Sequence, residues 1–304
     1  MSDEMVGVRD FRKRYGDFEA VKGISFAVKQ GEIFALLGPN GSGKTSTLES
    51  LEGLRKPDGG ALAVAGIDPS RQVRRLRSLI GVQLQTSALP PSMTVEEAMT
   101  FFCRYHGVEV REDLIERLGL SEVRKSQYAR LSTGQQRRLV LALAIAHDPK
   151  VLFLDEPTAG LDVQSRVELH ALIGEMRGKG ATVILATHDM AEAEKLADRA
   201  AILISGRIAA EGSPRQLTAS GSRKTRISVA TENGSLCVKK AAFQEAAFDG
   251  EADGYALYIS DNPGRAVAAI LSWLEKEKDG LIDLRVERPS LEERFLEITN
   301  GGAK

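Results

Sequence analysis

The stretch Ile33-Phe34-Ala35-Leu36-Leu37-Gly38-Pro39-Asn40-Gly41-Ser42-Gly43-Lys44-Thr45 decides the fold. It opens with an uninterrupted apolar run, which is typical of a strand buried on both faces of a parallel sheet. The remainder fits the pattern GxxxxGK[ST], and Leu48 and Leu51 follow at helical spacing. The sequence therefore predicts a strand, a glycine-rich loop and a helix in immediate succession.

The glycine-rich loop has the composition of a phosphate site. Its glycines allow backbone N–H groups to close around an anion at the start of a helix. Lys44 adds a positive charge near the outer phosphates, and Thr45 offers a hydroxyl to Mg²⁺. An ordinary glycine-rich turn is the alternative, but the flanking strand and helix are the context that the motif requires. We expect Mg-ATP to contact Gly38, Pro39, Asn40, Gly41, Ser42, Gly43, Lys44, Thr45 and Ser46.

A second apolar run, Val151 to Leu154, ends in two carboxylates. Ligands of open α/β sheets bind at the carboxyl ends of the strands, so both acids are expected at the phosphate site. Asp155 is predicted to hold Mg²⁺ through its coordination shell, and Glu156 to act as the base for the attacking water. The alternative is a pair of acids that only caps the next turn.

Two further apolar runs, Val183 to Ala186 and Ala200 to Ile204, alternate with helical stretches, which predicts an α/β core with a mainly parallel sheet. Val6 to Arg9 and Ile24 to Val28 alternate around the turn at Tyr15-Gly16-Asp17, which predicts an antiparallel edge. Thr94 to Gln127 lacks strand signals and lies in a helical subdomain expected at about residues 86–146.

A composition break at Thr218-Ala219-Ser220-Gly221-Ser222 indicates a linker. We therefore predict a nucleotide-binding domain over residues 1–217, a linker over 218–225 and a small α+β domain over 226–304. Ser290 and Glu293 are spaced as a capping box for a last helix.

Composition limits the partners. The net charge is −1, so no overall positive field would hold the chain on nucleic acid or anionic lipid. Cys103 and Cys237 fit no metal-ligand spacing and are interpreted as thiols in a reducing cytosol. The longest apolar runs fall short of the roughly 20 residues that span a bilayer, so the chain is not expected to cross a membrane.

Leu131-Ser132-Thr133-Gly134-Gln135-Gln136 precedes the acidic pair and opens an apolar helix. With it, residues 1 to about 220 resemble the nucleotide-binding subunits of ABC transporters. Thr133 is one departure, because the family most often has glycine there. Three further motifs match in the family's order, and they are the Q-loop at Gln85, the D-loop at Ala159-Gly160-Leu161-Asp162 and the switch histidine at His188.

The resemblance implies a head-to-tail dimer, in which Ser132, Gly134 and Gln135 reach the triphosphate held by Lys44 of a second copy. A serine and a glycine at a helix start can also bind an anion on physical grounds, and a plain helix N-cap is the alternative. Asp162 is expected beside the nucleotide in the same arrangement.

Three side chains are assigned mainly by position in the family. Tyr15 is expected to stack on adenine, with packing at a sheet edge as the alternative. Gln85 is expected to approach Mg²⁺ and the γ-phosphate, and His188 to contact the γ-phosphate or position the water. The catalytic set predicted from the sequence is thus Glu156, His188, Lys44 and Gln85, with Thr45, Gln85 and Asp155 around the metal.

The resemblance also requires separate polytopic membrane subunits, which places this subunit at the cytoplasmic face of the cell membrane. Thr86 to Gly107 is the expected docking surface, although its apolar side chains Leu89, Met93, Met99, Phe101 and Phe102 fit a helical core equally well. Glu287 to Thr299 resembles the end of ABC-2-type exporter ATPases, including drug and antibiotic efflux systems. Export is therefore predicted, with an importer subunit and a soluble ABC ATPase acting on DNA or the ribosome as alternatives.

Overall fold

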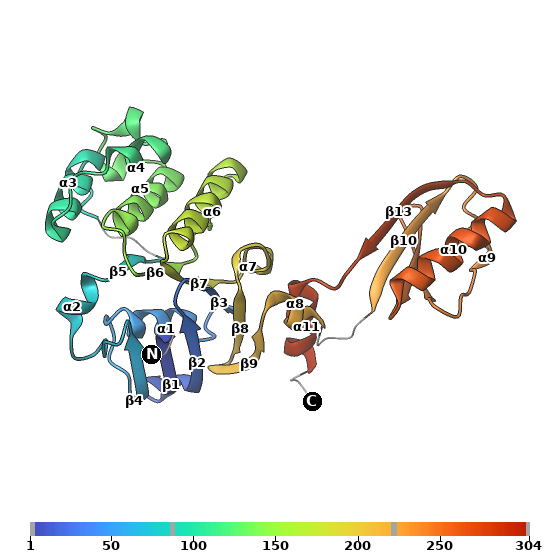
Figure 1. Cartoon of the computed structure of the whole chain (residues 1–304), viewed down its shortest axis with the longest axis horizontal. Coiled ribbons are helices and arrows are strands. Elements are labelled where there is room, and N and C mark those ends of the chain that lie inside the picture. Colours follow the sequence, from blue (N-terminus) through green and yellow to red (C-terminus); the bar gives the residue numbers. More distant parts are fainter. Residues whose placement is uncertain (1–3, 86–88, 220–223, 302–304) are drawn as a thin grey trace. The chain divides into compact units, whose positions relative to one another are not determined.

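The computed structural model describes residues 4–85, 89–219 and 224–301 of the chain (Figure 1). Contacts divide the chain into two units, Met1–Pro214 and Arg215–Lys304. Helix α8 (Pro214–Ala219) includes the first residues of the predicted linker, and residues 220–223 of that linker lie outside the described residues. No helix in the described ranges has the length and apolar character needed to cross a membrane.

A six-stranded sheet forms the centre of the first unit, in the order β5-β6-β7-β3-β8-β9. Its strands are parallel except for the last, which pairs antiparallel with its neighbour. The four apolar runs predicted as strands lie within it. The strands are β3 (Ile33–Leu37), β5 (Ile80–Gln83), β6 (Val151–Asp155), β7 (Thr182–Thr187), β8 (Arg199–Ile204) and β9 (Arg207–Gly212).

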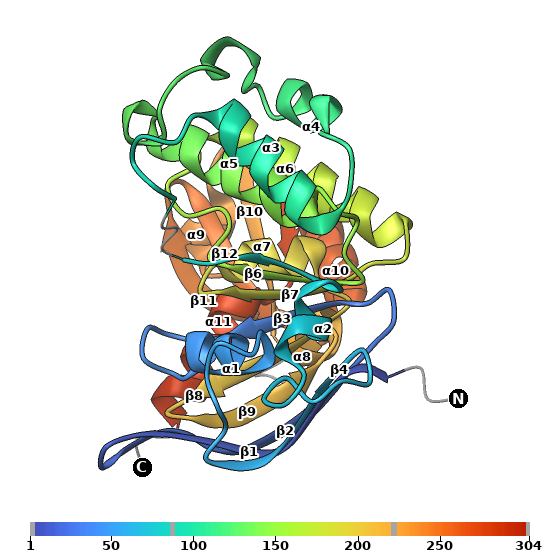
Figure 2. The same cartoon turned by 90° about the vertical axis from the view of Figure 1, so that its left-hand side faces the viewer.

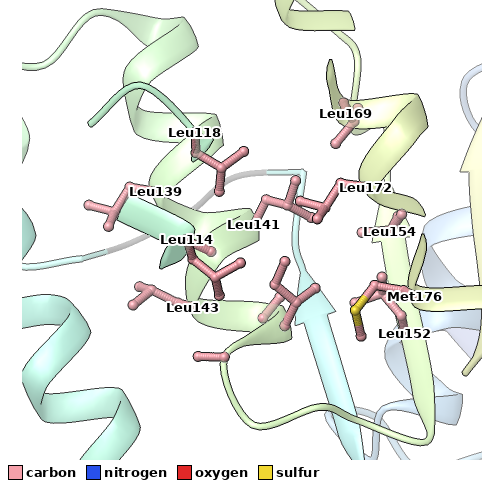
Figure 3. Close-up of a cluster of buried hydrophobic side chains, with 14 of the residues drawn as sticks. Leu114, Leu118, Leu139, Leu141, Leu143, Leu152, Leu154, Leu169, Leu172 and Met176 are labelled. Carbon is pink, nitrogen blue, oxygen red and sulfur yellow. The ribbon is translucent and has the colours of Figure 1, made fainter. Parts of the chain in front are cut away.

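Both faces of this sheet are buried, which explains why its central strands are apolar without alternation. Successive residues of one strand enter different cores: Leu152 and Leu154 pack in one hydrophobic cluster, and Phe153 packs in the other. Figure 3 shows the first cluster, in which Leu141 points toward Leu172 and Leu154, and Leu139 and Leu143 point to the other side of their helix.

The helices α3 (Val95–His106), α4 (Glu112–Arg117), α5 (Thr133–Ile145) and α6 (Val163–Gly178) lie on the side of this cluster (Figures 1 and 2). The predicted helical subdomain is confirmed by the first three. Thr94 and Glu97 form a capping box that fixes the start of α3, because each side chain bonds the other's backbone N–H. Gly107 ends the same helix in a left-handed conformation.

The opposite side of the central sheet carries an antiparallel sheet of order β2-β1-β4 (Figure 2). Strands β1 (Glu4–Tyr15) and β2 (Phe18–Lys29) confirm the predicted antiparallel edge, and Gly16 turns between them at φ 60°. The third strand, β4 (Gly59–Val64), was not predicted. The remaining α-helices described in this unit are α1 (Lys44–Leu51), α2 (Val73–Arg77) and α7 (Met190–Leu196), apart from α8, which starts at its last residue.

The second unit has its own sheet, of order β11-β12-β10-β13, and its own core around Tyr258, Ile227 and Ile270. Ser290 and Glu293 exchange the two hydrogen bonds of a capping box, each at 3.1 Å, as their spacing predicts. Its elements are β10 (Thr225–Thr231), α9 (Ser235–Lys239), β11 (Ala247–Ala252), β12 (Tyr255–Ser260), α10 (Pro263–Glu277), β13 (Leu281–Glu287) and α11 (Leu291–Gly301).

Candidate nucleotide site

The glycine-rich loop closes around the ammonium group of its own lysine. Lys44 Nζ donates to Gly38 O at 2.7 Å and to Pro39 O at 3.2 Å, and the side chain is buried. Burial lowers the pKa of Lys44, and the nearby carboxylates of Glu156 and Asp155 partly offset this effect. The positive charge is therefore held inside the loop, where the predicted phosphates would lie.

Gly43 shows why the loop needs glycine. Its φ of 105° is left-handed, and a Cβ at this position would lie 2.7 Å from Ala20 O. Helix α1 starts directly after it, at Lys44, so unpaired backbone N–H groups of the first turn point toward the loop.

A cavity of about 270 Å³ opens beside the loop and brings together residues that lie far apart in the sequence. Predicted residues dominate its lining, and Phe18 and Ala20 were missed. Both follow the first turn of the chain, where only the aromatic character of Phe18 gave a signal. The lining consists of Tyr15, Phe18, Ala20, Asn40, Gly41, Gly43, Lys44, Thr45, Ser46, Gln85, Asp155 and Glu156.

Asp155 lies at the carboxyl end of β6, opposite the start of α1. Its Oδ2 accepts a hydrogen bond from Thr45 Oγ1 at 2.9 Å. Its Oδ1 is buried and has no hydrogen-bond partner among the described residues. Burial raises the pKa of Asp155, an effect that the Thr45 hydroxyl partly counteracts. A carboxylate oxygen without a partner beside a hydroxyl is a donor set that suits a hard divalent cation.

The next residue, Glu156, is paired with the predicted switch histidine. His188 Nδ1 lies 2.8 Å from Glu156 Oε2. The sheet explains the contact, because Asp155 pairs with Ala186 in the β6–β7 ladder, and both side chains follow the ends of these strands. Glu156 is buried while most of the His188 side chain is exposed, so the pair extends from the interior to the open side of the site.

The backbone of Glu156 is held in a conformation that L-residues rarely adopt. Its φ is 49°, its N–H donates to Ala186 O at 2.8 Å, and its carbonyl accepts from Arg137 Nη1 at 2.7 Å. Such a conformation costs on the order of 1–3 kcal/mol and persists only where neighbouring contacts fix it. Arg137, on α5, was not predicted to support the site, and nothing in the sequence pattern distinguishes it from a surface arginine.

Tyr15 lies at the edge of the cavity, with its side chain 39% exposed. Its hydroxyl lies 3.1 Å from Ser46 Oγ, and the cations of Lys13 and Arg55 lie 5.5 and 5.4 Å from the ring centroid. The ring is thus fixed in orientation but still accessible, which suits the adenine contact predicted for it.

Replacing Tyr15 by alanine is expected to weaken ATP binding by about 1–3 kcal/mol, the range found for stacking of a base on an aromatic ring. Phenylalanine at the same position should retain most of the affinity, because the ring remains. Titration of both variants with ATP measures the difference. Equal affinity in wild type and the alanine variant would show that Tyr15 only packs at the sheet edge.

The residues assigned to a second copy do not line this cavity. Ser132 begins α5, where its Oγ accepts from Gln135 N at 3.2 Å and Gln135 Oε1 accepts from Ser132 N at 2.9 Å. Asp162 likewise begins α6 and accepts two hydrogen bonds at 2.8 Å from Ser165. In a single chain both residues are helix caps, and their assignment to a nucleotide stays a prediction.

The loop, the strand-end acids and the glutamate–histidine pair define an ATPase of the P-loop class. A protein-family model described as ABC transporter matches residues 21–159. The chain is 41% identical over 223 residues to Nod factor export ATP-binding protein I of Burkholderia orbicola, covering 71% of this chain and 73% of that protein. It is 33% identical to daunorubicin resistance ATP-binding protein DrrA3 of Streptomyces coeruleorubidus, covering 98% of this chain and 97% of that protein.

Solved structures agree with the fold. An ATP-binding subunit of an ABC transporter superposes with a TM-score of 0.67 and 27% identity, over 70% of this chain and 91% of that one. The cbiO1 protein of Clostridium perfringens, part of the ABC transporter complex cbiONQ, superposes with a TM-score of 0.61 and 31% identity, over 72% and 92%. The chain belongs to the ATP-binding subunits of ABC transporters, which bind and hydrolyse ATP. The predicted exporter-type subfamily is confirmed, and neither alternative receives support.

Proposed function

We propose that this chain drives export of a substrate by separate membrane subunits, from the cytoplasmic face of the membrane. The main support is that one cavity is lined by Lys44, Asp155 and Glu156. It thus brings together a lysine for the phosphates, a carboxylate for the metal ion and a base for the attacking water. The names of the relatives support export, and full-length similarity to a daunorubicin resistance protein favours an amphiphilic drug, antibiotic or lipid as the substrate class.

Magnesium is proposed as the cofactor because the side chains around Asp155 fit it. Asp155 Oδ1 and the Thr45 hydroxyl are the oxygens available in this chain, and Gln85 lines the same cavity. The described ranges contain no cluster of three or more His, Cys, Asp or Glu side chains suited to a metal. Oxygens of the triphosphate would therefore complete the shell, and the ion would neutralise charge on the transferring phosphoryl group.

The residues of this chain divide the chemistry between them. Lys44 stabilises negative charge on the transferring phosphoryl group. Glu156 Oε1, which is buried and has no hydrogen-bond partner in the described part of the chain, accepts a proton from the attacking water. His188 orients Glu156 through its other oxygen. Arg137 keeps the Glu156 backbone in place, so the base cannot rotate away from the strand end.

A second copy is proposed to complete the site. Ser132 is exposed at the start of α5 and does not line the cavity of its own chain. Ser132 caps the N–H of Gln135, whereas the N–H groups of Thr133 and Gly134 have no acceptor within the helix and favour an anion supplied from outside. A head-to-tail dimer would bring Ser132, Gly134 and Gln135 of one copy to the triphosphate held by the other.

The membrane subunits are proposed to dock in an apolar groove of about 510 Å³ beside α3, which we call the docking groove. Residues 86–88 of the predicted docking surface lie outside the described residues. Met99 is completely buried and belongs to the core, whereas the Phe101 side chain is 58% exposed. The groove is lined by Glu52, Leu54, Arg77, Ile80, Gly81, Val82, Leu84, Leu89, Phe101, Phe102, Tyr105, His106, Val140, Leu143, Ala144 and His147.

Replacing Phe101 by serine is expected to separate hydrolysis from transport. Basal ATPase of the isolated chain should stay within about twofold of wild type, because Phe101 is exposed and does not line the nucleotide cavity. Stimulation of ATPase by co-purified membrane subunits in liposomes should fall severalfold, because an exposed aromatic anchor is lost.

Val238 provides the matched control, because it is also apolar and exposed but lies in the second unit. Val238→Ser should leave stimulation unchanged. Full stimulation of the Phe101 variant would move the docking site away from this groove.

A further inference from the structure

Glu52 is a buried acid among the residues that line the docking groove. It follows the last residue of α1 and is only 3% exposed. Its Oε2 is buried and accepts no hydrogen bond from any residue that the structure describes. Buried carboxyl groups in native proteins nearly always have a partner, so one lacking it points to a ligand.

The surroundings of Glu52 favour a cation. Burial, together with the negative charges of Asp155 and Glu49, raises the pKa of Glu52 to about 8. A positive group within hydrogen-bond distance would favour the ionised form and relieve this repulsion. An apolar or acidic group would supply neither the positive charge nor the donor.

The walls of the groove define the rest of the ligand. Leu54, Leu84, Phe101 and Tyr105 line it and are exposed, so they offer apolar surface on the way to Glu52. Lysine and arginine combine an apolar stem with a charged tip, and such side chains place the stem along apolar surface and the tip on a polar partner.

We propose that Glu52 receives a lysine or arginine side chain from the segment of the membrane subunit that docks in this groove. The inference rests on the proposed function, because it takes the groove as the docking site. The aromatic residues Phe101 and Tyr105 hold the apolar face of the segment, and Glu52 selects a segment that carries one cation at the matching position. A segment with an apolar or acidic side chain there is disfavoured, since it leaves the buried carboxylate oxygen without a donor.

Arg77, on α2, is the rival occupant, because it lines the same groove and could pair with Glu52 within the chain. Arg77 and Glu52 do not form an ion pair in this structure, in which the two charged groups that shift the pKa of Glu52 are both acidic. The experiment therefore includes an Arg77 variant.

The first test uses the isolated, full-length chain and small probes. Titration with n-hexylguanidinium and with n-hexanol compares the same alkyl group with and without a cation. Wild type is expected to bind the cation about tenfold to a hundredfold more tightly, the range of a charge-assisted hydrogen bond. Glu52→Gln should abolish this preference without weakening hexanol, and the exposed Glu122→Gln should change neither. Equal binding of both probes by wild type would overturn the proposal without any variant.

Folding of Glu52→Gln is checked by its thermal midpoint. If this variant does not fold, Arg77→Gln in a wild-type background still decides between the occupants. If the preference for the cation is the same in Arg77→Gln as in wild type, Arg77 does not occupy Glu52 in the wild-type chain, which supports the proposal. A rise of more than about tenfold would show that Arg77 had occupied it, which overturns the proposal.

The second test separates this inference from the docking site itself. In liposomes with the co-purified membrane subunits, Glu52→Gln is expected to lose stimulated ATPase severalfold and to keep basal ATPase. If Phe101→Ser loses stimulation while Glu52→Gln retains it, the groove remains the docking site, but the proposal that Glu52 binds a cationic side chain is wrong. If both variants keep full stimulation, the groove is not the docking site and both proposals fail.

Discussion

Glu156→Gln is expected to bind ATP like wild type and to hydrolyse it about 10²–10⁴ times more slowly, the contribution typical of a general base. Glutamine keeps the size of the side chain and one oxygen for His188, which lies 2.8 Å from the glutamate in the wild type. It cannot accept a proton from water. Binding measured with a fluorescent ATP analogue and release of phosphate at saturating ATP give the two quantities separately.

The same variant tests the proposed dimer. If two copies enclose the nucleotide, blocked hydrolysis should make a dimer accumulate when ATP is added, and light scattering would detect it. Glu122→Gln, an exposed substitution remote in sequence from the site, should show neither effect. Normal turnover in the Glu156 variant would remove this residue as the base, and a monomer with bound ATP would contradict the shared site.

Lys44→Ala is expected to lose ATP binding itself, by roughly a factor of 10–100 or more. The Lys44 ammonium group is the cation that the glycine-rich loop encloses, through Gly38 O and Pro39 O. Without it, these carbonyl groups would face the phosphates with no positive charge between them. Isothermal titration with Mg-ATP measures the loss.

Lys56→Ala is the matched control, because Lys56 is exposed and follows the same helix. Its ATP affinity should equal that of wild type. Unchanged affinity in the Lys44 variant, with the thermal midpoint preserved, would exclude the loop as the phosphate site.

The apolar strands could be predicted from the sequence because both faces of the central sheet are covered. Ile33 to Leu37 is buried at every position, and its prediction matches β3 residue for residue. Two strands that lack such continuous burial were missed. β4 begins with two glycines and β9 alternates exposed and half-buried residues, so neither gave an apolar run.

The site could be predicted as a set of residues but not as a geometry. Asp155, Glu156 and His188 follow the carboxyl ends of predicted strands, which indicated that they lie at the same edge of the sheet. The hydrogen bond from Thr45 and the pairing with His188 depend on sheet register, which the sequence pattern does not contain. Arg137 and Glu52 could not be found, because their roles depend on which buried atoms they reach.

Apolar residues between positions 86 and 107 could be interpreted as core or as docking surface. The structure separates them, because Met99 faces the hydrophobic cluster and Phe101 faces outward on the same helix. Two positions along a helix differ by about 200° of rotation, and two such residues cannot share a face. Only knowledge of which face of α3 the core covers decides between them.

Helix α1 spans Lys44–Leu51 and is followed by Glu52. This short helix therefore connects the phosphate-binding loop with a residue that lines the docking groove. At 1.5 Å per residue this helix is about 12 Å long. A hydrogen-bonded helix of that length does not bend appreciably. A tilt at the phosphate end therefore shifts the other end at once. If the membrane subunit docks as proposed, helix α1 would transmit movement of the phosphate loop to it directly, without a relay of side chains.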